Sequence, residues 1–238
     1  MKQSKSKVGL LYLLLIFPVC IFAQTEETEK KEEEKKVVVV DSLYREDQFY
    51  ISIAYNLLQN SPSGFSQNSF SLGLSTGFLR DIPLNKKRTF AIAPGIGYTF
   101  NSLRQNMKIM EENNVVNYSI SSDFDRNKLE MHYLDIPVEV RWRTSTPESH
   151  KFWRVYSGFK FSYLMYSKSV YTGSDGKYKV TNNSDLNKIQ YGPYVGIGYN
   201  TFNAYAFYGL NPLFKSGEIE GERIKINVFS FLVIFYIL

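Results

Sequence analysis

Cysteine is almost absent from this 238-residue sequence, in which Cys20 is the single example. Cys20 lies in an N-terminal segment that has three lysines among its first seven residues, then an apolar run, and then the small residue Ala23. This arrangement is typical of a secretory signal peptide over residues 1–23, and an N-terminal helical anchor is the alternative. Cleavage after Ala23 would leave a mature chain without a thiol, which excludes disulfides, cysteine-zinc sites and cysteine catalysis.

The chain also has little excess charge of either sign. Three of the charges behind its formal net charge of +5 are signal-peptide lysines, so the mature chain would carry 5 − 3 = +2. That value excludes the electrostatic footprint of a nucleic-acid-binding protein. Residues 24–46 mix both signs of charge, which predicts a disordered leader, with a short charged helix as the alternative. Val37–Val40 within it is a plug, an extra strand, a partner-binding segment or the lead-in to the first strand.

Aromatic residues, by contrast, are abundant. The sequence has 18 Tyr and 18 Phe but only two Trp, and 16% of its residues are aromatic. This enrichment favours strands and membrane interfaces over an average soluble domain. Residues 47–238 have a length that suits one domain.

From Phe49 onward, apolar residues alternate with small or polar ones, which is the period of a β-strand and not of a helix. The alternation is weaker in the seventh of eight runs, and the eighth is apolar almost throughout, with an ambiguous phase. The eight runs predict eight strands: Phe49–Leu57, Phe70–Phe78, Phe90–Phe100, Leu129–Trp142, Trp153–Tyr166, Ile189–Asn200, Tyr205–Leu210 and Arg223–Leu238. The fourth run changes phase, with Leu129, Met131 and Tyr133 on one face before Leu134 continues it. A β-bulge near Tyr133-Leu134 would keep both sets on one side.

The connections between the runs alternate between long, about 12 to 27 residues, and short, about 3 to 11 residues. Long extracellular loops and short periplasmic turns are typical of an outer-membrane barrel, and an even number of strands places both termini in the periplasm. One face of the runs is apolar, and the other is made of small and polar residues. A soluble barrel of the lipocalin type has an apolar interior and a polar exterior, so this pattern favours contact with lipid. We therefore predict an all-β fold, a transmembrane antiparallel up-and-down β-barrel in the outer membrane.

No catalytic, cofactor-binding or metal-binding motif is found. The two Gly-x-Gly segments that begin at Gly95 and Gly196 lack the third glycine of a dinucleotide fingerprint and open no helix. His132 is expected to face the lumen and His150 to lie in a polar turn, and neither has partners at a catalytic or metal-ligand spacing. The chain is therefore predicted not to be an enzyme. A lipid-modifying enzyme remains the alternative, and it would need a serine beside a histidine at the barrel rim.

Charged residues are concentrated on the inward face of the fourth and fifth runs. If these runs pair across Thr144–Lys151, Glu139 is expected near Tyr156 and Arg141 near Arg154. Either a salt-bridge network fills a narrow lumen, because buried charges must be paired, or the set forms a selectivity or partner-docking surface at the periplasmic mouth. The predicted lumen charge cluster is Asp135, Glu139, Arg141, Arg143, Arg154 and Lys160. Pro137, which has no N–H, is expected to break the ladder locally.

The segment Tyr133–Arg141 resembles the tyrosine-leucine-acidic-isoleucine-proline signature of the small "porin family" outer-membrane barrels of Bacteroidota. The later segments Tyr191-Gly192-Pro193, Gly196–Tyr199 and Tyr208-Gly209-Leu210 follow the same pattern, so the resemblance spans residues 47–238. It implies an outer-membrane β-barrel in contact with lipid.

The longer, charged stretch from Arg141 to Arg154 is similar to the PorT proteins of type IX secretion and gliding motility. That resemblance implies a non-enzymatic accessory protein that acts with other secretion-system proteins. The leader residues Glu26–Val40 and the turn are then expected to bind these partners in the periplasm. The candidate turn residues are Thr144, Ser145, Thr146, Pro147, Glu148, His150 and Lys151.

Overall fold

The computed structural model describes residues 47–67, 69–144, 153–199 and 202–237. The predicted signal peptide, the predicted leader and turn residues 145–151 lie outside the described residues, so those expectations stay predictions.

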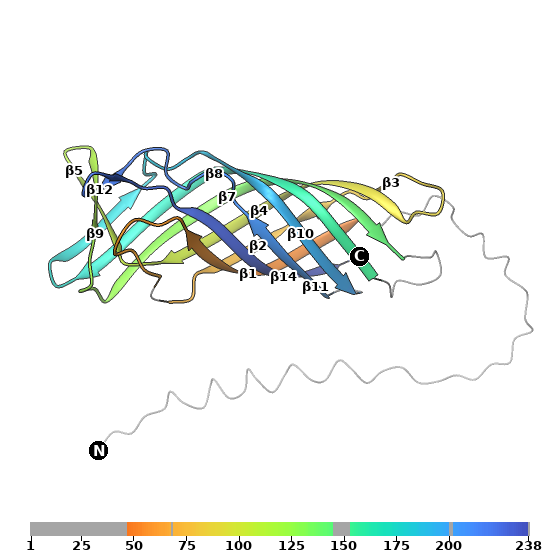
Figure 1. The fold of residues 1–238 in the computed structure, drawn as a ribbon, viewed down its shortest axis with the longest axis horizontal. Helices are drawn as coiled ribbons and strands as arrows, with labels where there is room; N and C mark the ends of the chain where they lie inside the picture. The colour runs from red at the N-terminus through yellow and green to blue at the C-terminus, as the bar shows by residue number, and fades with distance from the viewer. Residues whose placement is uncertain (1–46, 68, 145–152, 200–201, 238) are drawn as a thin grey trace, which may run out of the picture. The chain divides into compact units, whose positions relative to one another are not determined.

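Within the described residues, eight long antiparallel strands form a closed barrel, and the predicted fold class is confirmed (Figure 1). Each strand pairs with the next, and the ring closes because β1 pairs with β14 as well as with β2. The barrel strands are β1 (Gln48–Gln59), β2 (Leu72–Leu79), β4 (Phe90–Arg104), β7 (Arg126–Arg143), β8 (Trp153–Gly173), β10 (Ile189–Tyr199), β11 (Phe202–Tyr208) and β14 (Asn227–Ile237). The part of the chain that the structure describes has no helix long and apolar enough to cross a membrane.

Shorter strands lie in the connections, which the sequence pattern had left as loops. They are β3 (Ile82–Pro83), β5 (Met107–Glu112), β6 (Val115–Ile120), β9 (Gly176–Thr181), β12 (Glu218–Ile219) and β13 (Glu222–Arg223). β5 and β6 form a hairpin whose two turn residues, Asn113 and Asn114, have φ values of 52° and 62°. Such positive values are those of a type I′ turn, which asparagine tolerates.

The barrel has two different ends in Figure 1. β5, β9 and β12 gather at one end, here called the plug end. β3 and the C-terminal end of β14 lie at the other end, here called the turn end.

The fourth predicted strand differs from expectation in one respect. β7 alternates between buried and exposed positions without interruption, so Leu129, Met131 and Tyr133 point inward and Leu134 points outward. The predicted bulge in this strand is therefore wrong. The bulge is instead in the neighbouring strand β8. Tyr166 and Leu164 pair with the consecutive β7 residues His132 and Tyr133, so Met165 is the extra residue.

His132 is also outward, and the expectation that it faces the lumen is wrong. Its ring packs against Phe100 and Tyr166 on the outer surface. The predicted break at Pro137 is confirmed, since the pairing of β4 with β7 omits Gly95 and Ile96, the residues opposite Pro137 and Ile136. Proline has no N–H to donate there.

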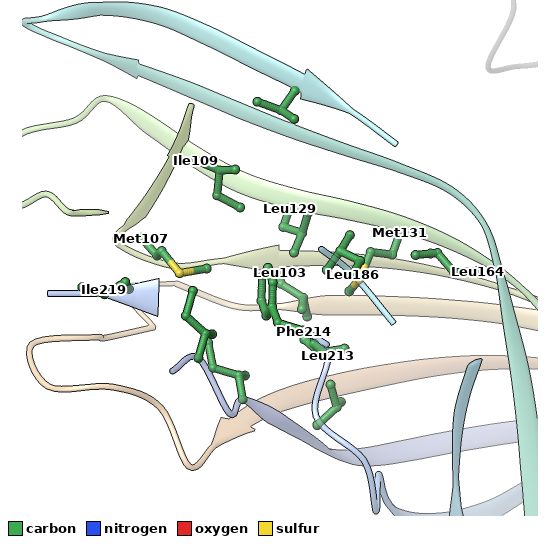
Figure 2. Close-up of a cluster of buried hydrophobic side chains, with 14 of the residues drawn as sticks. Leu103, Met107, Ile109, Leu129, Met131, Leu164, Leu186, Leu213, Phe214 and Ile219 are labelled. Carbon is green, nitrogen blue, oxygen red and sulfur yellow. The ribbon is translucent and has the colours of Figure 1, made fainter. Parts of the chain in front are cut away.

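The barrel is filled by different chemistry at its two ends. At the plug end, connections fold over the lumen and bury an apolar cluster, which Figure 2 shows. This plug cluster includes Leu103, Met107, Ile109, Leu129, Met131, Leu164, Leu186, Leu213, Phe214 and Ile219. The sequence had predicted a lumen of small and polar residues throughout. The difference arises because residues outside the eight predicted runs supply much of the cluster.

Candidate functional site in the barrel interior

Two buried arginines converge on one aspartate at the turn end. Asp81, which follows β2, lies 2.9 Å from Arg143 through its Oδ2 atom and 3.5 Å from Arg141 through its Oδ1 atom. At most 1% of each of these side chains is exposed. Ions removed from water this completely are tolerated only when they are paired. Asp81 is therefore a counter-ion that both arginines share.

A second pair joins Glu139 and Arg141 on the same face of β7. The Nε–H of Arg141 donates to Oε2 of Glu139 at 2.8 Å, and the Tyr205 hydroxyl donates to Oε1 at 3.0 Å. Tyr205 and Tyr236 are joined by a hydroxyl–hydroxyl hydrogen bond of 2.6 Å. Both oxygens of the Glu139 carboxylate are thus occupied, which offsets its desolvation.

Tyrosine rings surround these ion pairs. The guanidinium of Arg141 lies 5.7 Å from the ring centroid of Tyr236 and 5.9 Å from that of Tyr156, within the range of cation–π attraction. Tyr156 stacks on Tyr205 with their centroids 5.2 Å apart. The buried tyrosines of this turn-end cluster are Tyr50, Tyr156, Tyr194, Tyr205 and Tyr236.

A third ion pair lies deeper in the lumen. Lys160 Nζ is 3.5 Å from Asp135 Oδ2, and the Thr99 hydroxyl donates to the same carboxylate oxygen. Two cavities of about 50 and 40 Å³ share Asp135 and Lys160 in their walls. Cavities of this size have room for a few water molecules each, and not for an organic substrate.

Two polar atoms in the wall of the 50 Å³ cavity have no hydrogen-bond partner among the described residues. They are the Ser52 hydroxyl and Asp135 Oδ1. Buried water bonds to groups of this kind. The arrangement supports a hydrated pocket around the Asp135–Lys160 pair, closed at the plug end by the apolar cluster.

All six predicted lumen charges point inward, and the structure brings them together at the turn end and the middle of the lumen. Their predicted pairing was wrong by two residues. Arg141 lies opposite Tyr156, and Arg143 lies opposite Arg154. β7 and β8 are paired as far as Arg143 and Arg154. Beyond this pair, the Thr144 N–H donates to the Trp153 carbonyl at 3.1 Å. Of the predicted partner turn, Thr144 is described and exposed, and the other residues lie outside the described residues.

Sequence reasoning missed Asp81 and the tyrosine cluster. Asp81 lies in a connection with no periodic pattern that could assign it a direction. The tyrosines had a detectable signal, because Tyr50, Tyr156 and Tyr194 occupy the small and polar phase of their runs. Among the residues that the structure describes, no group of three or more His, Asp or Glu side chains could hold a metal ion.

Comparison with known proteins gives a family and a distant structural neighbour. The model of the family described as "Outer membrane protein beta-barrel domain" matches residues 22–215. The crystal structure of Ail, the attachment invasion locus protein of Yersinia pestis, is 11% identical, with 80% of this chain and 96% of that chain covered at a TM-score of 0.40. No curated protein matches the chain.

Proposed function

This chain belongs to the outer membrane protein β-barrel domain family, and on that premise we propose that it acts by binding partner proteins at its ends, as a closed and non-enzymatic barrel. The observation that carries the proposal is the filled interior. Buried ion pairs and tyrosines occupy the turn end, and the apolar cluster occupies the plug end. An eight-stranded barrel has an interior just wide enough for side chains to fill. Binding sites for partner proteins are therefore expected at the two ends and on the outer wall, and not in the interior.

The proposed partner system is type IX-like protein secretion and gliding. The resemblance of the stretch from Arg141 to Arg154 to PorT proteins supports this part of the proposal. Two charged residues of the turn end belong to that stretch, since Arg143 and Arg154 pair with each other at the last rung of β7 and β8. The docking elements proposed here are the leader and the turn Thr144–Lys151.

In the proposed organisation, residues 1–23 are a signal peptide, 24–46 a leader and 47–238 the barrel. We place the turn end and both termini in the periplasm, and the plug end outside the cell. The plug end has the longer connections and the added hairpins, which supports this orientation because extracellular loops are the longer ones.

The deciding experiment is a deletion strain complemented with variants. Wild-type chain should restore secretion of cargo with the C-terminal sorting domain, and a variant with a two-residue loop in place of Thr144–Lys151 should not. The matched control replaces the Asn113-Asn114 turn with Asn-Gly at the plug end, and it should restore secretion. Barrel insertion is checked for each variant by heat-modifiable migration on gels. Normal secretion from the deletion strain, or from the shortened-turn variant, would contradict the proposal.

The second candidate is a stand-alone barrel with a structural, adhesive or minor pore role. The two cavities that share Asp135 and Lys160 in their walls favour the minor pore over the other two roles. Planar-bilayer recording separates the candidates, because stable conductance steps from the purified wild-type barrel would support a pore, and their absence would support the closed barrel.

A further inference from the structure

Cations are concentrated on one side of the barrel wall, at the plug-end extension of four adjacent strands. They occupy outward positions. The cations of β4, β7 and β8 alternate in phase with exposed residues of the same strand. The two lysines of β9 lie opposite outward positions of β8. This set, here called the basic patch, consists of Arg104 on β4, Arg126 and Lys128 on β7, Lys168 on β8, and Lys177 and Lys179 on β9.

The register of the strands makes the basic patch continuous. Arg104 pairs with Lys128, which pairs with Val170, and Val170 pairs with Lys179. One rung further, Arg126, Thr172 and Lys177 lie side by side in the same way. Neighbouring strands are about 4.8 Å apart, so these cations form one continuous positively charged surface.

Few acids balance the basic patch. Of the outward positions on these strands at the plug end, Glu130 supplies the carboxylate. It contacts both Lys128 and Lys168. Four other cations share the surface. The remaining barrel strands (β10, β11, β14, β1 and β2) contain no lysine or arginine. Among the strands of the wall, the outward lysines and arginines are therefore confined to β4, β7, β8 and the adjoining β9.

The aromatic residues below the patch indicate its depth in the membrane. Tyr98 and His132 are hydrogen-bonded on the outer surface, and the His132 ring packs against Phe100 and Tyr166. Aromatic groups with a polar atom are enriched at the membrane–water interface. Lys128 lies four residues beyond His132 on β7, which is roughly 10 Å along the membrane normal for a strand tilted about 40°. This is the depth of lipid head groups.

We propose that the basic patch binds the phosphate groups of an anionic membrane lipid whose acyl chains lie on the apolar wall below. Charge complementarity and continuity with the lipid-facing surface support a lipid over a soluble anion. The identity of the lipid rests on the proposed orientation. If the plug end faces outward, the ligand is a phosphorylated glycolipid of the outer leaflet, of the lipid A type.

The test uses the full mature chain, refolded into nanodiscs of neutral phosphatidylcholine that contain a small fraction of phosphorylated lipid A, dephosphorylated lipid A or phosphatidylglycerol. Lipid bound to the barrel is measured by native mass spectrometry after release from the disc. The patch variant is K168Q/K177Q/K179Q. The matched control, K86Q/K87Q/K215Q, removes the same charge from exposed residues outside the basic patch.

Wild type and control should retain phosphorylated lipid A, and the patch variant should retain about 100-fold less, because each lysine near an anionic surface contributes about a fivefold change. Equal retention by all three proteins would overturn the proposal, as would displacement of the lipid by millimolar inorganic phosphate. Retention of phosphatidylglycerol as strong as that of lipid A would overturn the assignment to a glycolipid. Cargo secretion is measured separately, so a failure here is distinguishable from a failure of the proposed secretion role.

Discussion

Tyr205 on β11 donates a hydrogen bond of 3.0 Å to Glu139 on β7, although β8 and β10 separate these two strands along the barrel wall. The bond therefore crosses the lumen. Together with the ion pair between Asp81 and Arg143, it ties distant parts of the wall to each other through the interior. A barrel braced in this way resists opening at its turn end.

Replacing Asp81 with asparagine should destabilise the barrel by about 3–5 kcal/mol, because it leaves two buried guanidinium groups without their shared counter-ion. Urea unfolding in lipid vesicles, followed by tryptophan fluorescence, measures the change. The control is Arg80→Gln, which breaks the largely exposed ion pair of Arg80 with Asp47. Exposed pairs contribute about 0–1 kcal/mol. A D81N variant as stable as the control would show that the arginines do not depend on Asp81.

Replacing Tyr205 with phenylalanine removes one hydroxyl and keeps the ring. Glu139 and Tyr236 both lose a hydrogen-bond partner in a buried site, so we expect a loss of about 1–3 kcal/mol in the free energy of unfolding. The same change at the outward-facing Tyr208 should cost no more than about 0.5 kcal/mol. Equal effects at the two positions would contradict a bracing role for the cross-lumen bond.

The contact between the β5–β6 hairpin and the β8–β9 turn should depend on pH. The hydrogen bond between Lys108 and Asp175 raises the pKa of the Lys108 ammonium and lowers the pKa of the Asp175 carboxyl. The stabilisation from Asp175 is present above its ordinary pKa near 3.8 and is lost as the pH falls through its lower folded value. The stabilisation from Lys108 is present below its ordinary pKa near 10.5 and is lost as the pH rises through its raised folded value.

Carbon NMR of the aspartate carboxyl groups in micelles measures this directly. In wild type, the Asp175 signal should titrate below the ordinary aspartate range, and in a Lys108→Met variant it should return to that range. An unchanged Asp175 titration in the variant would rule out the pairing in solution.

The proposed orientation can be tested by labelling single cysteines in a chain whose Cys20 is replaced by serine. Glu112→Cys in the β5–β6 hairpin should react with a membrane-impermeant maleimide in intact cells. Lys87→Cys, in the connection between β3 and β4, should react only after the outer membrane is permeabilised. The reverse pattern would place the plug end in the periplasm and move the basic patch to the inner leaflet.

The sequence by itself determined the barrel, its strand count and the direction of most side chains. Period-two alternation is a local property of the strand, so Arg141 and Arg143 could be placed inward, and Ile136 and Val140 outward, before any partner was known. The bulge in β8 escaped prediction because it is a mismatch between two strands and has no signature in one of them.

Only the tertiary structure decided what meets across the lumen. Asp81 joins Arg143, and Tyr205 joins Glu139, through contacts between elements that are not adjacent in the wall, and such contacts depend on the register of every strand between them. The plug cluster likewise forms because connections fold back over the lumen, where Met107 and Phe214 find apolar neighbours that no local pattern specifies. Alternation fixes which way a side chain points, whereas closure of the barrel fixes what it touches.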